Sequence, residues 1–122
     1  MPDVSATVGE LREAMRRFVA ERQWEPFHSP KNLSMGLAIE TAELMEHFQW
    51  VDCEESRRLG QDQKRRVAIG EEMADVACYL LALANVLEMD LSDAIVDKLR
   101  KNAEKYPVEE FRGRYAKDEG WA

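Results

Sequence analysis

Apolar residues recur every three or four positions along most of this chain, which is the spacing of one face of an α-helix. In the first such segment Val8, Leu11, Met15, Phe18 and Val19 share a face. No segment shows the strict alternation of a half-buried strand. The pattern therefore predicts an all-α fold of four helices, at about residues 8–22, 30–49, 63–88 and 91–106.

Local start signals support these helices. Thr7 with Glu10 matches a capping box, in which each side chain bonds the other's backbone N–H. Ser29 and Pro30 match an N-cap followed by proline at the first helical position. Asp90 marks the start of the last helix. We expect loops between the helices, at 23–30 and 52–61.

The third helix is apolar at nearly every position from Met73 to Leu87. A helix that is apolar all round is buried on most sides. Asp75 nevertheless lies inside this run, one turn after Glu72, so both carboxylates share a face. Because an unpaired buried carboxylate is costly, something must compensate this pair.

A second acidic pair, Glu40 and Glu43, has the same spacing on the second helix. Two packed helices would combine Glu40, Glu43, Glu72 and Asp75 into a cup of oxygen ligands, which suits a hard cation such as Mg²⁺. The alternative is a solvated acidic face with Arg65 or Arg66 as ion-pair partners. A di-iron carboxylate site would need the motif Glu-x-x-His. The residue three positions before His47 is Leu44, so the sequence does not build that site.

Aromatic residues stand at the ends of predicted elements. Trp24 and His28 lie in the loop before the second helix, and Trp50 follows that helix. Tryptophan faces stack on nucleobases, and histidine can bond a base edge. Tyr79 lies one turn after Asp75, so its hydroxyl could reach the ligand of the acids. The alternative is that these aromatics are core anchors.

A polar stripe runs along the fourth helix. Lys98, Asn102 and Tyr106 are spaced four residues apart and therefore share one face. A cation, an amide and a phenol in a row suit phosphate oxygens. The alternative is a solvated face whose basic residues complement the helix dipole.

Length and composition limit the number of domains, the partners and the location that we expect for this protein. The 122 residues predict a single domain, with a core at about 8–107 and a polar tail at 108–122. The net charge of −7 argues against binding a nucleic-acid polymer. Two cysteines without a CxxC pair, no visible signal peptide and no apolar run of membrane length predict a cytoplasmic protein.

Taken together, these motifs resemble the all-α nucleoside triphosphate pyrophosphohydrolases of the MazG-like superfamily, and within it the dCTP pyrophosphatase branch. The acidic signature of that family, ExxE followed by ExxD, corresponds to 40–43 and 72–75. The branch is matched by the segments 24–28, 43–50 and 98–107. The likeness covers about residues 8–107 and leaves out the tail.

The resemblance implies a four-helix-type bundle that assembles as a homodimer or homotetramer. It implies Mg²⁺ on the acidic residues. Any carboxylate that is not fully committed to the metal could act as the general base, and our candidate is Glu43. The nucleoside pocket would be Trp24, His28, Trp50 and Tyr79, and Lys98, Asn102 and Tyr106 would steady the phosphates. The expected reaction converts dCTP, or a related modified pyrimidine nucleotide, to the monophosphate and pyrophosphate.

The rival hypothesis is a non-enzymatic helical interaction module, in which the acids form salt bridges and the tryptophans anchor a protein partner. Under either hypothesis the third helix has more apolar faces than three other helices can cover. We therefore predict self-association, with Leu80, Leu81 and Ala84 on the face left open to water in one chain.

Overall fold

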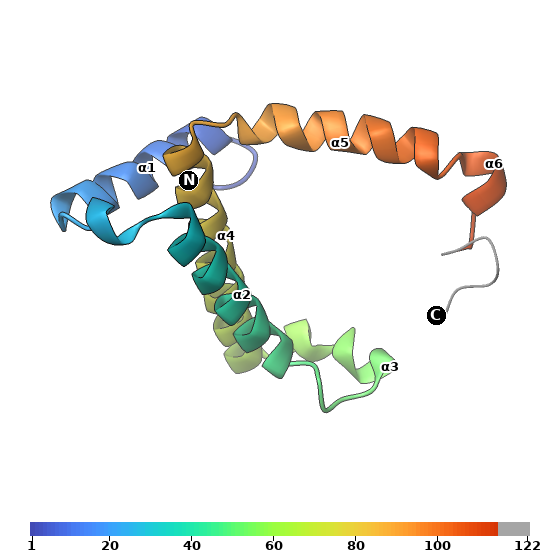
Figure 1. The fold of residues 1–122 in the computed structure, drawn as a ribbon. Coiled ribbons are helices and arrows are strands. Elements are labelled where there is room, and N and C mark those ends of the chain that lie inside the picture. Colours follow the sequence, from blue (N-terminus) through green and yellow to red (C-terminus); the bar gives the residue numbers. More distant parts are fainter. Residues whose placement is uncertain (115–122) are drawn as a thin grey trace. The chain divides into compact units, whose positions relative to one another are not determined.

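A computed structural model describes residues 1–114 of the chain, and every regular element in that part is a helix. Four long helices account for most of it, and short helical turns lie between and after them (Figure 1). In chain order the elements are α1 (Val8–Glu21), η1 (Glu25–Phe27), α2 (Pro30–Glu46), α3 (Cys53–Ser56), η2 (Leu59–Gln61), α4 (Gln63–Leu87), α5 (Leu91–Lys105) and α6 (Val108–Phe111).

The predicted helix starts are confirmed. The Thr7 side chain accepts a hydrogen bond from the backbone N–H of Glu10, whose carboxylate accepts one from Thr7. Ser29 caps α2, and Asp90 caps α5. The predicted end of the second helix was wrong by three residues, because α2 stops at Glu46 and turns continue the chain. The short elements η1, α3, η2 and α6 were not predicted.

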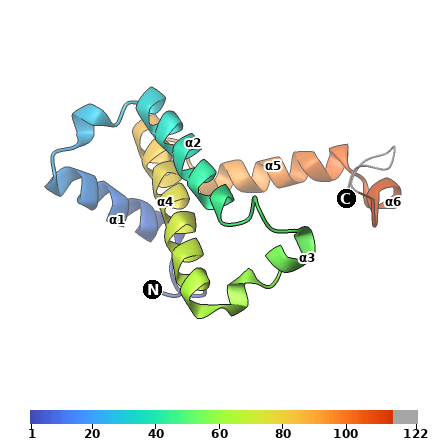
Figure 2. The same ribbon diagram turned by 90° about the horizontal axis from the view of Figure 1, so that it is seen from below.

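The first of two compact units spans Met1–Met89. Within it α2 lies alongside α4, and α1 packs against α4, as Figures 1 and 2 show from two directions. Burial of apolar side chains at these contacts is the main force that holds such helices together. The buried core consists of Val19, Leu33, Leu59, Ala82 and Ala84.

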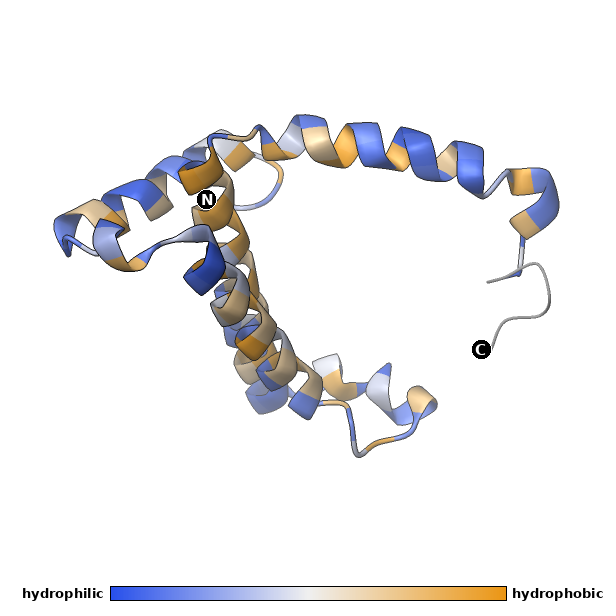
Figure 3. Cartoon of the chain, viewed as in Figure 1, coloured by the Kyte–Doolittle hydropathy of each residue, from blue (hydrophilic) through white to orange (hydrophobic). Residues whose placement is uncertain are grey.

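The second unit begins at Asp90 and contains α5 and α6. Within α5, Asp97 forms ion pairs with Arg100 and Lys101, one turn further along the helix. The ring of Tyr106 meets Phe111 of α6 edge-on, with centroids 5.1 Å apart. In Figure 3, apolar bands recur along α5 between polar ones, which is the pattern of an amphipathic helix. Residues 115–122 of the predicted tail lie outside the described residues.

Helix α4 is less covered than its sequence predicts. Only Ala82 and Ala84 are buried on it, and Asp75 is exposed rather than enclosed. The predicted open face is confirmed for Leu80, which is 38% exposed, but was wrong for Ala84, which is 7% exposed because the chain itself covers it. Leu81 is half-buried. No helix in the described part of the chain is both long enough and apolar enough to cross a membrane.

Candidate metal and nucleotide site

Three carboxylates meet where α2 packs against α4. Glu40 and Glu43 lie one turn apart on α2, and Glu72 faces them from α4. One carboxylate oxygen from each lies within 4.8 Å of the others. We call this group the acidic cup. The i, i+3 spacing places each pair on one face, and the α2–α4 contact brings the two faces together.

The acidic cup is short of positive charge and of hydrogen-bond donors. One oxygen each of Glu40 and Glu72, Oε2 in both, is buried without a hydrogen-bond partner. Burial, and then the neighbouring Glu43 carboxylate, raises the pKa of both Glu40 and Glu72 above the usual value. Orphaned buried oxygens are rare in native proteins and need an explanation. An oxygen donor set of this kind fits Mg²⁺ or a similar hard divalent cation.

Asp75 lies at the edge of the acidic cup. It is not one of the three carboxylates whose oxygens cluster within 4.8 Å. Its charge still contributes to raising the pKa of Glu40 and of Glu72, after burial and the effect of Glu43. The exposed Asp75 also lines the same pocket as Glu40, so it can face a ligand held there.

This pocket, which we call the cup pocket, has a volume of about 300 Å³ and lies between α1, the following loop, α2 and α4. It brings together three of the four predicted base-binding residues, Trp24, His28 and Tyr79, with Glu40 and Asp75. The remaining wall is mostly apolar, and its residues are Met15, Phe18 and Cys78. The ring of Trp24 meets that of Phe18 edge-on at 5.7 Å, which fixes the orientation of the indole.

Tyr79 reaches the cup pocket because α2 carries a glycine opposite it. A Cβ atom on Gly36 would lie 2.8 Å from Tyr79 Cζ and 2.9 Å from Cδ1, closer than side chains tolerate. The missing side chain therefore lets the tyrosine ring approach the backbone of α2 closely. This close approach sets the position of the ring beside the acids.

The other predicted site residues are not among those that line the cup pocket. Trp50 follows the end of α2, is 87% exposed and does not line the cup pocket. Lys98 and Asn102 on α5, and Tyr106 directly after it, belong to the second unit. Arg65 and Arg66 do not compensate the acids: Arg66 donates to the carbonyl of Gly60, and among the described residues no ion pair joins either arginine to the cup.

Met15, Phe18 and Cys78 line the cup pocket without having been predicted as site residues. Met15 and Phe18 carry the ordinary signal of an inward helix face, and Cys78 lies in an apolar run. Periodicity cannot separate a pocket wall from a core, so nothing in the sequence pattern distinguishes these residues.

Comparisons with known proteins agree on the family. The sequence model of the MazG-like family matches residues 36–118. The chain is 40% identical over 111 residues to the mouse protein named dCTP pyrophosphatase 1, a match covering 91% of this chain and 65% of that protein. The human dCTP pyrophosphatase 1 is 40% identical over 102 residues, covering 84% of this chain and 60% of that protein. The chain thus spans about two thirds or less of the length of these relatives.

A solved structure is also similar. The crystal structure of a pyrophosphatase from Archaeoglobus fulgidus superposes with a TM-score of 0.72 at 40% sequence identity. The match covers 81% of this chain and 91% of that one. Agreement in both sequence and backbone indicates that the acidic cup sits on a helical scaffold shared with that protein.

Proposed function

Because this chain belongs to the MazG-like family, we propose that it is a Mg²⁺-dependent nucleoside triphosphate pyrophosphohydrolase acting on dCTP or a related, modified pyrimidine nucleotide. The observation that carries the proposal is the acidic cup opening beside a pocket lined by Trp24, His28 and Tyr79. The names of the mouse and human relatives support the reaction class and the nucleotide, and the archaeal pyrophosphatase supports the reaction class.

In this proposal Glu40, Glu43, Glu72 and Asp75 hold the cation. The two buried oxygens without partners, on Glu40 and Glu72, are the atoms that most need a positive ligand. A bound divalent cation neutralises charge on the phosphate oxygens and lowers the pKa of a water molecule. Glu43 is exposed at the rim of the cup and is our candidate for the general base that orients and deprotonates the attacking water.

The remaining predicted site residues would bind the base and the phosphates of the nucleotide. Trp24 offers a stacking face to the base, with His28 and Tyr79 on the same pocket wall. Lys98 and Asn102 share one face of α5, and Tyr106 follows at the same spacing. We assign these three to the phosphate oxygens, since a cation and two polar donors match that chemistry.

We further propose that the working form is a homodimer or homotetramer. Large apolar side chains stand open on α2 and α4, among them Ile39 at 59%, Met73 at 57% and Leu80 at 38% exposure. Such patches on one chain mark an interaction surface, and a symmetric interface between copies is the usual way to cover them. Trp50, 87% exposed, is a further large side chain that a partner subunit would cover. The two free cysteines, Cys53 and Cys78, support a reducing, cytoplasmic location.

The experiment is pyrophosphate release from a panel of nucleoside triphosphates, with and without Mg²⁺. We expect turnover of dCTP or a modified dCTP only with the metal, and its loss in Glu43→Ala and Asp75→Ala while the helical circular dichroism persists. Full activity in either variant would remove the metal assignment. No turnover of any nucleotide by the parent protein would favour the non-enzymatic interaction module instead.

Light scattering at micromolar concentration tests the assembly. A mass of at least two chains is expected. A stable and active species of 14.1 kDa would show that one chain is sufficient.

A further inference from the structure

Helix α1 ends in a turn that returns the chain to the helix at Trp24. The backbone N–H of Gln23 donates to the carbonyl of Ala20 at 3.0 Å, and that of Trp24 donates to the carbonyl of Val19 at 3.1 Å. These two bonds form a Schellman motif, in which the chain passes through a left-handed residue, usually glycine. Here that residue is Gln23, whose φ is 53°. Residues other than glycine keep this conformation only where the surrounding contacts hold them in it.

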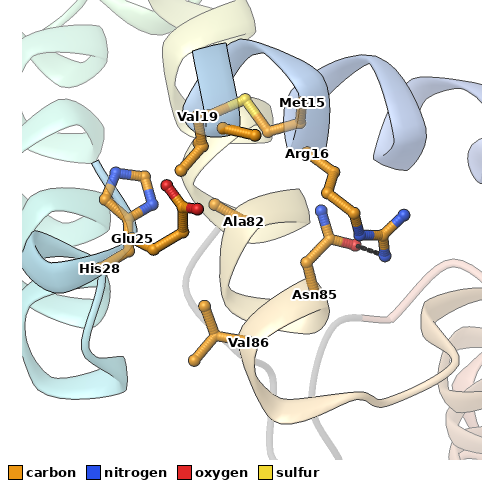
Figure 4. Close-up of a pocket in the computed structure, with 9 residues that line it drawn as sticks. Met15, Arg16, Val19, Glu25, His28, Ala82, Asn85 and Val86 are labelled. Atoms are coloured by element: carbon orange, nitrogen blue, oxygen red, sulfur yellow. Dashed lines mark hydrogen bonds between the residues drawn. The ribbon is translucent and has the colours of Figure 1, made fainter. Parts of the chain in front are cut away.

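The backbone at this turn is fixed to the rest of the first unit. Val19, whose carbonyl accepts the bond from Trp24, has a buried side chain. It lines a second pocket, of about 340 Å³, together with Ala82 and Val86 of α4 and Glu25 of the η1 turn (Figure 4). The backbone of Trp24 is therefore held in place, whereas the position of its ring depends on side-chain contacts.

The ring of Trp24 rests on Phe18, a side chain that is itself half open to water. Trp24 is 41% exposed and Phe18 is 42% exposed. Their rings meet edge-on, with centroids 5.7 Å apart, and a contact of this kind commonly accompanies a Schellman motif. Exposed side chains change rotamer within nanoseconds. Packing alone therefore does not hold the phenylalanine ring, or the indole beside it, in one position.

Arg22 supplies a further contact to Phe18. Its guanidinium carbon lies 3.8 Å from the centroid of the Phe18 ring, which is the arrangement of a cation–π pair. Arg22 Nη1 also donates to the backbone carbonyl of Phe18 at 3.0 Å. The same nitrogen is 3.8 Å from a carboxylate oxygen of Glu21, which is too far for a hydrogen bond. The guanidinium thus contacts both the ring and the backbone of the residue on which Trp24 rests.

We propose that Arg22 is a positioning residue, which orders the Trp24 indole for stacking on the base by holding the ring of Phe18. This inference rests on the proposed function, in which Trp24 stacks on the base, and adds the group that prepares this surface before a nucleotide arrives. A side chain that is ordered in advance loses less entropy on binding. Arg22 is not among the residues that line the cup pocket, so its effect should appear in nucleotide affinity and not in the chemical step.

The first test compares Arg22→Lys and Arg22→Ala with the parent protein on dCTP. Lysine keeps the positive charge but has no planar group to lie on a ring, and alanine has neither. We expect both variants to raise KM by about two- to fivefold with kcat unchanged, which corresponds to the ~0.5–1 kcal/mol of an exposed cation–π pair. A parent-like KM in Arg22→Lys would show that charge alone matters and would overturn the stacking role.

Arg17→Ala is the matched control for this test. Arg17 is an exposed arginine of the same helix, and its side chain makes no hydrogen bond or ion pair with the residues that the structure describes. The control removes the same charge from α1 and should keep the parent KM. An equal rise of KM in the control would attribute the effect to net charge and would count against Arg22.

A double-mutant cycle asks whether Arg22 acts through Phe18. Phe18→Leu removes the ring and keeps an apolar side chain on the pocket wall. In that background Arg22→Ala should weaken the binding of dCMP, measured by calorimetry, no further, because the ring that Arg22 holds is gone. An additive loss in the double variant would show that Arg22 acts by another route and would overturn the proposal. Melting temperatures of every protein in the cycle show that each is folded.

Fluorine NMR of protein labelled with 5-fluorotryptophan reports on the indole directly and needs no turnover. The Trp24 signal is identified by its absence from Trp24→Phe. In Arg22→Lys this signal should move towards that of the free amino acid, while the signals of the other tryptophans stay in place. An unmoved Trp24 signal would overturn the role of Arg22 and leave the proposed function standing. If the parent hydrolyses no nucleotide, the proposed function fails, and the Trp24 signal still decides whether Arg22 orders the indole.

Discussion

Replacing Asn85 by alanine tests the contact that holds α1 against α4. The Asn85 side chain accepts from Arg12 Nε and Arg16 Nη2 and donates to the carbonyl of Arg12. Arg12 Nη1 also donates to the carbonyl of Met89, at 2.6 Å, beyond the end of α4. The substitution removes the three bonds that involve Asn85 and leaves only the last of these contacts.

The magnitude follows from these contacts. A protein hydrogen bond contributes about 0.5–1.5 kcal/mol net, and half-exposed partners recover part of the loss in water. We therefore expect Asn85→Ala to lower the free energy of unfolding by about 1.5–3 kcal/mol. For a domain of this size the melting temperature should fall by about 6–15 °C. Thermal unfolding followed by circular dichroism measures this shift.

The same substitution should affect substrate binding. Helix α1 carries Met15 and Phe18, which line the cup pocket, so loosening α1 should raise KM more than it lowers kcat. Asn85→Asp keeps an acceptor for both guanidinium groups and should retain most of the stability. Ser34→Ala, which removes one exposed bond from the Ser34 hydroxyl to the carbonyl of Lys31, is the control and should change stability little. A melting temperature in Asn85→Ala equal to that of the control would refute the reasoning.

Three further predictions concern the charges and the aromatic residues. Glu72→Gln removes one of three clustered carboxylates, so in chelator the variant should melt higher than the parent, and Mg²⁺ should no longer raise its melting temperature. Trp24→Ala should raise KM by about one to two decades, since base stacking is worth ~1–3 kcal/mol; an unchanged nucleotide affinity by calorimetry would count against the stacking role. The hydrogen bonds from Lys101 and Arg100 lower the pKa of Asp97 from its usual value of 3.8. The ionised carboxylate therefore stabilises α5 fully at a pH above 3.8, and this contribution disappears as the pH falls through the lower pKa of the folded state. Hydrogen exchange in α5 should therefore be faster in Asp97→Asn than in the parent at pH 7, and a difference that did not shrink as the pH was lowered below 3.8 would contradict this cause.

The helix starts could be predicted because their chemistry is local. Thr7 and Glu10 satisfy each other within one turn, and Ser29 needs only the backbone N–H of Asn32. The end of α2 has no comparable signal, since residues after Glu46 continue in turns without a glycine or proline to stop the helix. The helix starts were therefore predicted correctly, whereas the second helix was predicted to continue three residues too far.

The candidate site was predictable in part for the same reason. Each acidic pair, such as Glu40 with Glu43, is visible from spacing alone, but their meeting with Glu72 depends on the packing of α2 on α4. Burial was harder to predict. The apolar run around Asp75 suggested an enclosed carboxylate, whereas in one chain too few helices cover α4 and Asp75 is exposed. The apolar positions of a helix reflect every surface that is buried in the working protein, including any surface that would be buried against a second chain.

Glu25 shows what spacing alone cannot reveal. In the sequence it is one charged residue beside Trp24 in a predicted loop, inside the segment 24–28 that matches the dCTP pyrophosphatase branch, and it has no periodic partner. The η1 turn directs its carboxylate toward α4, and Ala82 is small enough to leave space opposite it. What such a carboxylate can contact depends on the one point of a pocket at which it is placed. Such placement results from a turn, a helix contact and a small residue on the opposite wall together, so it becomes visible only once the fold has assembled them.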